Sequence, residues 1–128
     1  MKNQLNLIVV AKWQQLMNER NVVKILELTE ETIEIVGPKG SVCGRQSFVD
    51  WIQYAGLTLT TLKSYVNEDK LVLKQHALLK DDAGQIKKES IVYTYIIMKN
   101  GKVASLTYFY NSQEAEESSG ISLQNETI

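Results

Sequence analysis

The sequence is poor in the residues that build metal centres and disulfide frameworks. Its 128 residues include one cysteine, Cys43, one histidine, His76, and one proline. A lone cysteine excludes a disulfide within the chain and is typical of a reducing compartment, so we expect a cytoplasmic protein. One cysteine and one histidine also cannot supply the ligands of a usual zinc site, and no Asp-x-Asp spacing indicates a calcium loop. We therefore expect neither a metal nor another cofactor.

An excess of one charge and long apolar runs are also missing. The chain has 14 Lys and Arg residues against 15 Asp and Glu residues, which gives a formal net charge of -1. This balance leaves no basic surface for nucleic acid or for an anionic membrane. The apolar run from Leu7 to Val10 is too short for a signal-peptide core, and no run is long enough to span a bilayer. We expect no nucleic-acid partner and no membrane partner.

Apolar residues near the N-terminus recur at three- and four-residue steps, a spacing typical of helices that pack by one face. The first helix is expected to have Asn3 as its N-cap, and its apolar stripe consists of Leu5, Val9, Trp13, Leu16 and Met17. A shorter helix is expected to begin after a second cap at Asn21.

A short strand, a loop and a third helix are expected next. Alternation around Ile33 and Ile35 predicts the strand, and the Gly-Pro-Lys-Gly run that starts at Gly37 predicts a loop as far as Gly44. The third helix is expected to end at Gly56, and its apolar face consists of Phe48, Trp51, Ile52 and Ala55.

From residue 57 onward the apolar period changes to two, which predicts strands. Turn residues at 67–69, 81–84 and 100–101 divide this half into four strands, and Asn100-Gly101 is typical of a type I′ hairpin turn. One face of the first strand is expected to hold Leu57, Leu59, Thr61, Lys63 and Tyr65. One face of the second is expected to hold Leu71, Leu73, Gln75, Ala77 and Leu79.

These elements predict an α+β fold, a cone-shaped α+β barrel in which three N-terminal helices pack on a curved antiparallel sheet. We expect one domain over residues 1–112 and a flexible C-terminal tail over residues 113–128, because the tail has little apolar content. The strand segment 91–98 is apolar or aromatic on both faces. A second copy of the chain would cover the outer face, so we expect a homodimer through the sheet face.

Three short motifs and the order of the elements resemble one known family. The motifs are Gly37-Pro38-Lys39-Gly40 with Gly44 and Trp51, then Val72-Leu73-Lys74-Gln75-His76-Ala77, then Gly101-Lys102-Val103. From Leu5 to Ala115 the chain resembles the nuclear transport factor 2-like superfamily, in its uncharacterised bacterial branch similar to polyketide cyclases and ketosteroid isomerases. The resemblance implies the fold and a central pocket more than a chemistry.

The sequence departs from the enzymes of that superfamily. Ile35 stands where the resemblance implies the catalytic Asp of ketosteroid isomerases, and an Ile cannot abstract a proton. The Asp-Arg-Asp set of the epoxide hydrolases has no inward-facing match either. Steroid-type isomerisation is therefore disfavoured.

The candidate ligand-binding residues are polar or aromatic side chains on the expected inner surfaces: Trp51, Gln75, Tyr93, Tyr95, Tyr108 and Tyr110. Gln75 either orients a ligand in an apolar pocket or is an amide bonded within the core. Trp51 is either a core side chain or a ligand platform. The tyrosines either pack across strands and at a dimer face, or offer one or two hydroxyls to a ligand.

His76 is the one candidate general base, and alternation places it opposite Gln75 on a surface beside Lys74 and Lys80. Cys43 would need His76 as its base to act as a nucleophile. Lys87-Lys88 is interpreted as a solvated face.

Three functions remain open. The first is a non-catalytic protein that binds a small apolar molecule. The second is an isomerase, cyclase or dehydratase acting on a small apolar substrate, which requires His76 to face the pocket. The third is a protein–protein interaction module that uses the sheet face.

Overall fold

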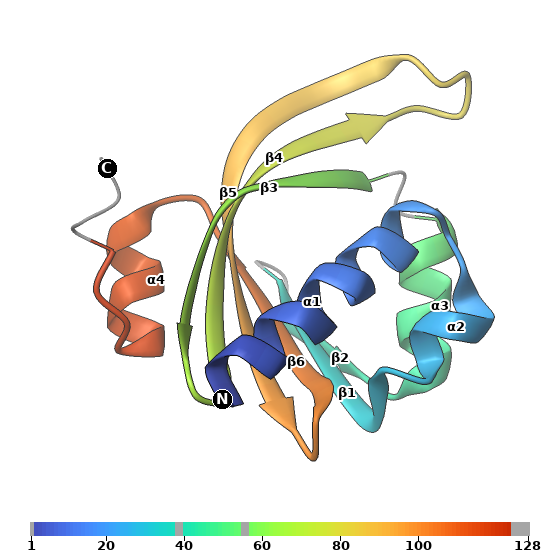
Figure 1. Ribbon diagram of the computed structural model, residues 1–128. Helices are drawn as coiled ribbons and strands as arrows, with labels where there is room; N and C mark the ends of the chain where they lie inside the picture. Colours follow the sequence, from blue (N-terminus) through green and yellow to red (C-terminus); the bar gives the residue numbers. More distant parts are fainter. Residues whose placement is uncertain (1, 38–39, 55–56, 124–128) are drawn as a thin grey trace.

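The structure, a computed structural model, describes residues 2–37, 40–54 and 57–123. In these ranges the helices are α1 (Lys2–Asn18), α2 (Val22–Leu26), α3 (Arg45–Tyr54) and α4 (Ser112–Ser119). The strands are β1 (Thr29–Gly37), β2 (Gly40–Cys43), β3 (Leu57–Asn67), β4 (Lys70–Lys80), β5 (Ile86–Lys99) and β6 (Lys102–Phe109). The sheet curls around α1, α2 and α3, and α4 lies on its other side (Figure 1).

Within the described residues the strands form one six-stranded sheet in the order β2-β1-β6-β5-β4-β3. Strands β1 and β6 are parallel, and every other neighbouring pair is antiparallel. The sheet is therefore mixed, and it curls without closing, because β2 and β3 are its two edges. The predicted α+β class and the curved sheet over N-terminal helices are confirmed.

The predicted turns between the last three strands are confirmed. Asn100 and Gly101 have φ values of 54° and 75°, as a type I′ turn requires at its two central residues. In the β4–β5 turn, the Asp81 carboxylate accepts hydrogen bonds from the backbone N–H groups of Ala83 and Gln85 at 2.9 and 3.0 Å.

The predicted single face of the β3 strand is wrong beyond Thr61. The β3–β4 register shifts between Thr61 and Lys63, and Leu62 in the bulge is 55% exposed. An extra residue reverses the alternation, so the side chains after it change faces. Leu59 therefore packs in the inner core, whereas Tyr65 packs in the outer cluster.

The structure corrects two local predictions in the first half of the chain. Residues 40–43 form strand β2, which pairs with β1, instead of continuing a loop to Gly44. Asn3 lies inside α1, and its Oδ1 accepts from the backbone N–H of Glu68 at 2.7 Å, so it is not the N-cap. Asn21 is confirmed as the cap of α2. The Pro38-Lys39 turn and the helix end at Gly56 lie outside the described residues.

The region predicted as a flexible tail begins with helix α4 instead. Asn111 caps the helix by accepting from the backbone N–H of Glu114 at 2.8 Å, and Gly120 ends it at φ 74°. The buried side chains of this segment, Ala115, Ile121 and Leu123, pack on the outer face of the sheet against Val72, Tyr93 and Tyr95. The chain itself thus covers part of the apolar outer face that was assigned to a second copy.

The inner core fills the space between the helices and the concave side of the sheet. Trp13 and Phe48 stack at its centre, with ring centroids 5.7 Å apart. The indole N–H of Trp13 donates to the Thr29 hydroxyl at 2.9 Å, and Thr29 donates to the carbonyl of Ile25 at 2.7 Å. These buried polar groups are therefore paired, as buried groups in protein cores usually are.

Candidate functional site

A pocket of about 250 Å³ lies where β1, β4 and β6 end and β3 and β5 begin, beside α3. Apolar side chains form most of its wall: Ile35, Leu57, Leu59, Ala77, Leu79 and Val92. The other lining residues are Gly37, Trp51, Lys88, Ser90, Tyr108 and Tyr110. The cone is therefore hollow at this end, as the sequence analysis expected.

Strand alternation positions the β4–β5 side of the pocket. Ala77 pairs with Ser90, and Leu79 pairs with Lys88, so all four side chains point to the concave side of the sheet. Figure 1 shows that the hairpin of these two strands bends over the side on which the helices lie. Because of this curvature, the two strands form one wall of the pocket.

An aromatic pair forms the opposite wall. Trp51 of α3 and Tyr108 of β6 stack with centroids 5.8 Å apart and an interplanar angle of 28°. Trp51 follows Phe48 by three residues on the same helix face, so the fully buried Phe48 fixes the helix against the core and directs Trp51 toward the sheet. Trp51 thus lines the pocket and also packs against the inner core.

The Tyr108 hydroxyl is the one polar group of this wall that is both buried and unpaired. It has no hydrogen-bond partner among the described residues. Burial raises the pKa of Tyr108 far above its ordinary value, so the phenol stays protonated at neutral pH. An unpartnered buried hydroxyl costs about 1–3 kcal/mol.

The mouth of the pocket carries a positive charge. The Lys88 Nζ lies 5.9 Å from the centroid of the Tyr110 ring, a cation–π distance. Tyr110 is 59% exposed and Lys88 is exposed, so both are at the rim. No lining residue that the structure describes is acidic. Lys88 is solvated as predicted, but it also borders the pocket, which strand alternation from Val92 and Ser90 could have indicated.

Gln75 lies in the core instead of the pocket. It is fully buried, and its Nε2 donates to Gln14 Oε1 at 2.9 Å and to the Thr61 hydroxyl at 3.1 Å. Its Oε1 accepts from the Thr94 hydroxyl at 2.6 Å. These contacts match the alternative in which the amide is bonded within the protein.

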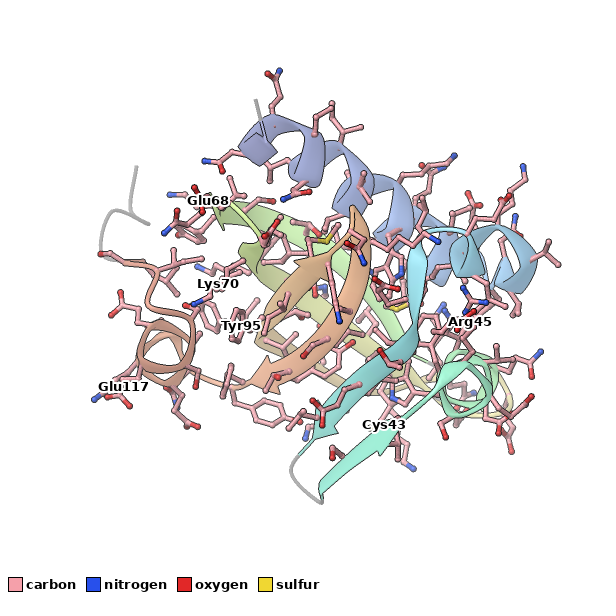
Figure 2. All side chains as sticks on the ribbon, turned by 90° about the horizontal axis from the view of Figure 1, so that it is seen from below. Cys43, Arg45, Glu68, Lys70, Tyr95 and Glu117 are labelled. Carbon is pink, nitrogen blue, oxygen red and sulfur yellow. The ribbon has the colours of Figure 1, made fainter. Side chains whose placement is uncertain are left out.

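Tyr93 and Tyr95 lie on the outer face of the sheet. They pack against the C-terminal segment, and Figure 2 shows Tyr95 on the α4 side of the sheet. Period-two alternation explains the placement, because their neighbour Val92 points inward to the pocket. The structure therefore brings Trp51, Tyr108 and Tyr110 together and leaves these two tyrosines elsewhere.

The groups considered for catalysis do not meet at the pocket. His76 is on the outer face, as alternation predicted, with Nε2 3.5 Å from Glu89 Oε2. Cys43 is exposed on the edge strand β2 (Figure 2), and β1, β6 and β5 separate it from the strand of His76. The two residues therefore form no dyad. Ile35 lines the pocket, so no carboxylate occupies that position.

Metal-binding clusters and membrane-spanning helices are both absent from residues 2–37, 40–54 and 57–123. In that part of the chain, no three His, Cys, Asp or Glu side chains are grouped so as to hold a metal ion. None of its helices combines the length and the apolar character that a membrane crossing requires.

The comparisons with known proteins rest on the fold. The sequence matches no family model and no curated protein. A nuclear transport factor 2-like protein of unknown function from Cytophaga hutchinsonii is 13% identical with a TM-score of 0.71, covering 86% of this chain and 93% of that one. A Mycobacterium tuberculosis protein in complex with estradiol-17β-hemisuccinate is 14% identical with a TM-score of 0.72, covering 85% and 95%.

A third solved structure is a computationally designed binder of 17-OHP. It is 16% identical with a TM-score of 0.72, and the match covers 85% of this chain and 95% of that one. At such identities the likeness shows the fold alone, and this fold is the one that the resemblance implied. This chain has the α+β fold of the nuclear transport factor 2-like superfamily.

Proposed function

We propose that this protein binds a small, mostly apolar molecule in the pocket and does not transform it. The observation that carries the proposal is a pocket with a mostly apolar wall whose lining includes Tyr108, a residue with a buried hydroxyl that has no partner among the described residues. Ligand sites typically combine apolar walls with a few polar groups that fix orientation, in volumes of about 300–1,000 Å³. At about 250 Å³ the pocket suits a molecule with one or two rings.

The apolar wall supplies the driving force for binding. Burial of apolar surface contributes about 25 cal/mol per Å², so a ligand that buries about 150 Å² gains about 4 kcal/mol before the cost of association. The hydrogen bond to Tyr108 then selects ligands with an acceptor oxygen. Two solved neighbours with this fold are described as a 17-OHP binder and as a complex with estradiol-17β-hemisuccinate, which supports a binding role.

The position of His76 favours binding over catalysis. A general base must reach the proton it abstracts, and this imidazole lies on the face of the sheet opposite the pocket. No lining residue that the structure describes is a histidine, an aspartate or a glutamate, and burial raises the pKa of Tyr108, so its phenol stays protonated near neutral pH.

Two earlier predictions are kept as proposals. We propose a cytoplasmic location, which the single free cysteine supports. We also propose a homodimer through the part of the outer face that α4 leaves open, where Leu62 and Ile91 are 55% and 38% exposed. A monomer mass by light scattering at micromolar concentration would contradict the dimer.

The proposed function is tested by filling the pocket. The protein is purified without denaturation, extracted with organic solvent, and the released molecules are compared by mass spectrometry with those from Ala77→Phe, whose ring would enter the pocket. Leu78→Phe is the matched control, because this neighbour on β4 points to the outer face. We expect a small molecule from the wild type and the control that is absent from Ala77→Phe.

A second blocking variant helps to distinguish a filled pocket from a misfolded protein. Ser90→Phe enters the same pocket from β5, and circular dichroism confirms that each variant is folded. Fluorescence titration with 2-naphthamide covers the case in which the natural ligand is lost during purification. A wild type that releases no molecule and does not bind 2-naphthamide, or folded variants that bind as well as it does, would refute the proposal.

A further inference from the structure

We propose that the ligand of this pocket is an amphipathic anion, an apolar ring system whose carboxylate lies at the mouth beside Lys88. This inference rests on the proposed binding function and adds the chemical class of the ligand. Its basis is the lining of the pocket, which includes one lysine and no acidic residue that the structure describes. Tyr108 and Lys88 both line this pocket, Tyr108 on its inner wall and Lys88 at the rim.

Lys88 is held at the mouth. Its pairing with Leu79 directs the side chain to the concave side of the sheet, and its Nζ lies 5.9 Å from the Tyr110 ring centroid. An ammonium in this position loses less conformational freedom on meeting an anion than a free surface lysine does. The sheet and the aromatic rim therefore present the charge to whatever occupies the pocket.

No carboxylate neutralises this ammonium in the part of the chain that the structure describes. The lining contains no acidic residue, and the described ion pairs do not include Lys88. Glu89, the acidic neighbour in sequence, points to the outer face and lies 3.5 Å from His76. A cationic ligand would meet repulsion at this mouth, whereas an anionic one would find an unpaired partner.

The two donors divide the ligand into an inner and an outer end. Tyr108 is inside, where burial of a full charge is costly, so its O–H suits a neutral acceptor such as a carbonyl or hydroxyl oxygen. Lys88 is exposed at the rim, where a carboxylate keeps part of its hydration. The rim therefore accommodates the charge at low desolvation cost, and the apolar body lies against the wall between the two ends.

The test uses two probes of nearly the same shape, one an anion and the other neutral. Purified protein is titrated with 2-naphthoate and with 2-naphthamide at pH 7.5 and low ionic strength, with Trp51 fluorescence and heteronuclear NMR shifts as readouts. We expect the carboxylate to bind about two- to fivefold more tightly, the range that partly exposed ion pairs give. High salt should reduce the preference, because it screens exposed charges.

Variants assign the preference to one side chain. Lys88→Gln should abolish the preference for the carboxylate, measured as the ratio of the dissociation constants of the two probes. Lys87→Gln is the matched control, because it removes an exposed charge from the adjacent residue, which is not part of the lining. This control should keep the wild-type preference.

The outcomes separate this inference from the function on which it rests. If both probes bind equally to the wild type, the anionic ligand is refuted and the binding function stands. The same conclusion follows if Lys88→Gln keeps the preference. If neither probe binds and no pocket residue shifts in the NMR spectrum, the binding function itself fails and the inference falls with it.

Discussion

Tyr108→Phe is expected to stabilise the ligand-free protein while it weakens ligand binding. The substitution removes one buried oxygen that has no partner among the described residues and keeps the ring that stacks on Trp51 at 5.8 Å. Leaving such a group unpaired costs about 1–3 kcal/mol. We expect the free energy of unfolding to rise by about 1 kcal/mol, the low end of that range.

Urea denaturation and thermal melting measure this gain. An increase of about 1 kcal/mol corresponds to roughly 3–6 °C in Tm for a domain of this size. Tyr95→Phe is the matched control, because Tyr95 is buried on the outer face and away from the pocket. Its effect should stay within about 0.5 kcal/mol.

Binding should change in the opposite direction. A hydrogen bond from the Tyr108 hydroxyl to a ligand oxygen contributes about 0.5–1.5 kcal/mol, so we expect about two- to tenfold weaker binding of 2-naphthamide by Tyr108→Phe. The Tyr95→Phe protein should bind normally. If Tyr108→Phe destabilises the free protein and leaves binding unchanged, the hydroxyl already has a partner in the folded chain, and the reasoning about the pocket is wrong.

Three further predictions concern the rest of the fold. Burial raises the pKa of Tyr108, so the folded chain keeps this proton at pH values where the unfolded chain, with a pKa of about 10, loses it. The contribution of Tyr108 to stability should therefore be constant below about pH 10 and fall above it, so urea midpoints across alkaline pH should fall less steeply in Tyr108→Phe. Gln75→Leu leaves Gln14 and Thr94 without their buried partner and should cost about 2–4 kcal/mol in urea denaturation; a loss below about 1 kcal/mol would show that this network adds little. Asn111→Ala removes the cap of α4 and should cost about 0.5–2 kcal/mol, and hydrogen exchange should increase in residues 112–119 alone; unchanged exchange there would mean that packing, not the cap, holds the helix.

Local sequence patterns predicted much of the order of helices and strands along the chain. The three-residue and four-residue spacing predicted α1 and α3, and period two predicted the strands from residue 57 onward. Asn100-Gly101 predicted a turn that the φ values confirm. These predictions hold because backbone geometry and side-chain periodicity act over neighbouring residues, so the sequence contains their cause.

Helix α4 shows where composition was a poor guide. The segment is rich in Glu, Ser and Gln, yet three buried apolar side chains and one cap are enough to pack a short helix on a sheet. The local signal was present in Asn111 and Glu114, whose spacing is that of a capping box. The sequence could not show that the outer face of the sheet offers an apolar surface on which those few side chains pack.

The sequence by itself determined the α+β class, the strand faces up to the first bulge, and the placement of His76 away from the inner surface. Only the tertiary structure decided that Gln75 is bonded within the core while Tyr108 has no partner among the described residues, because both polar groups lie on inward faces and differ in what surrounds them. Alternation from Val92 and Ser90 indicates the inward face for Lys88, but the curvature of the β4–β5 hairpin decides that this face borders a pocket. Local periodicity fixes the side of a strand to which a residue points, whereas the packing of distant elements fixes whether it meets a neighbour or an open space.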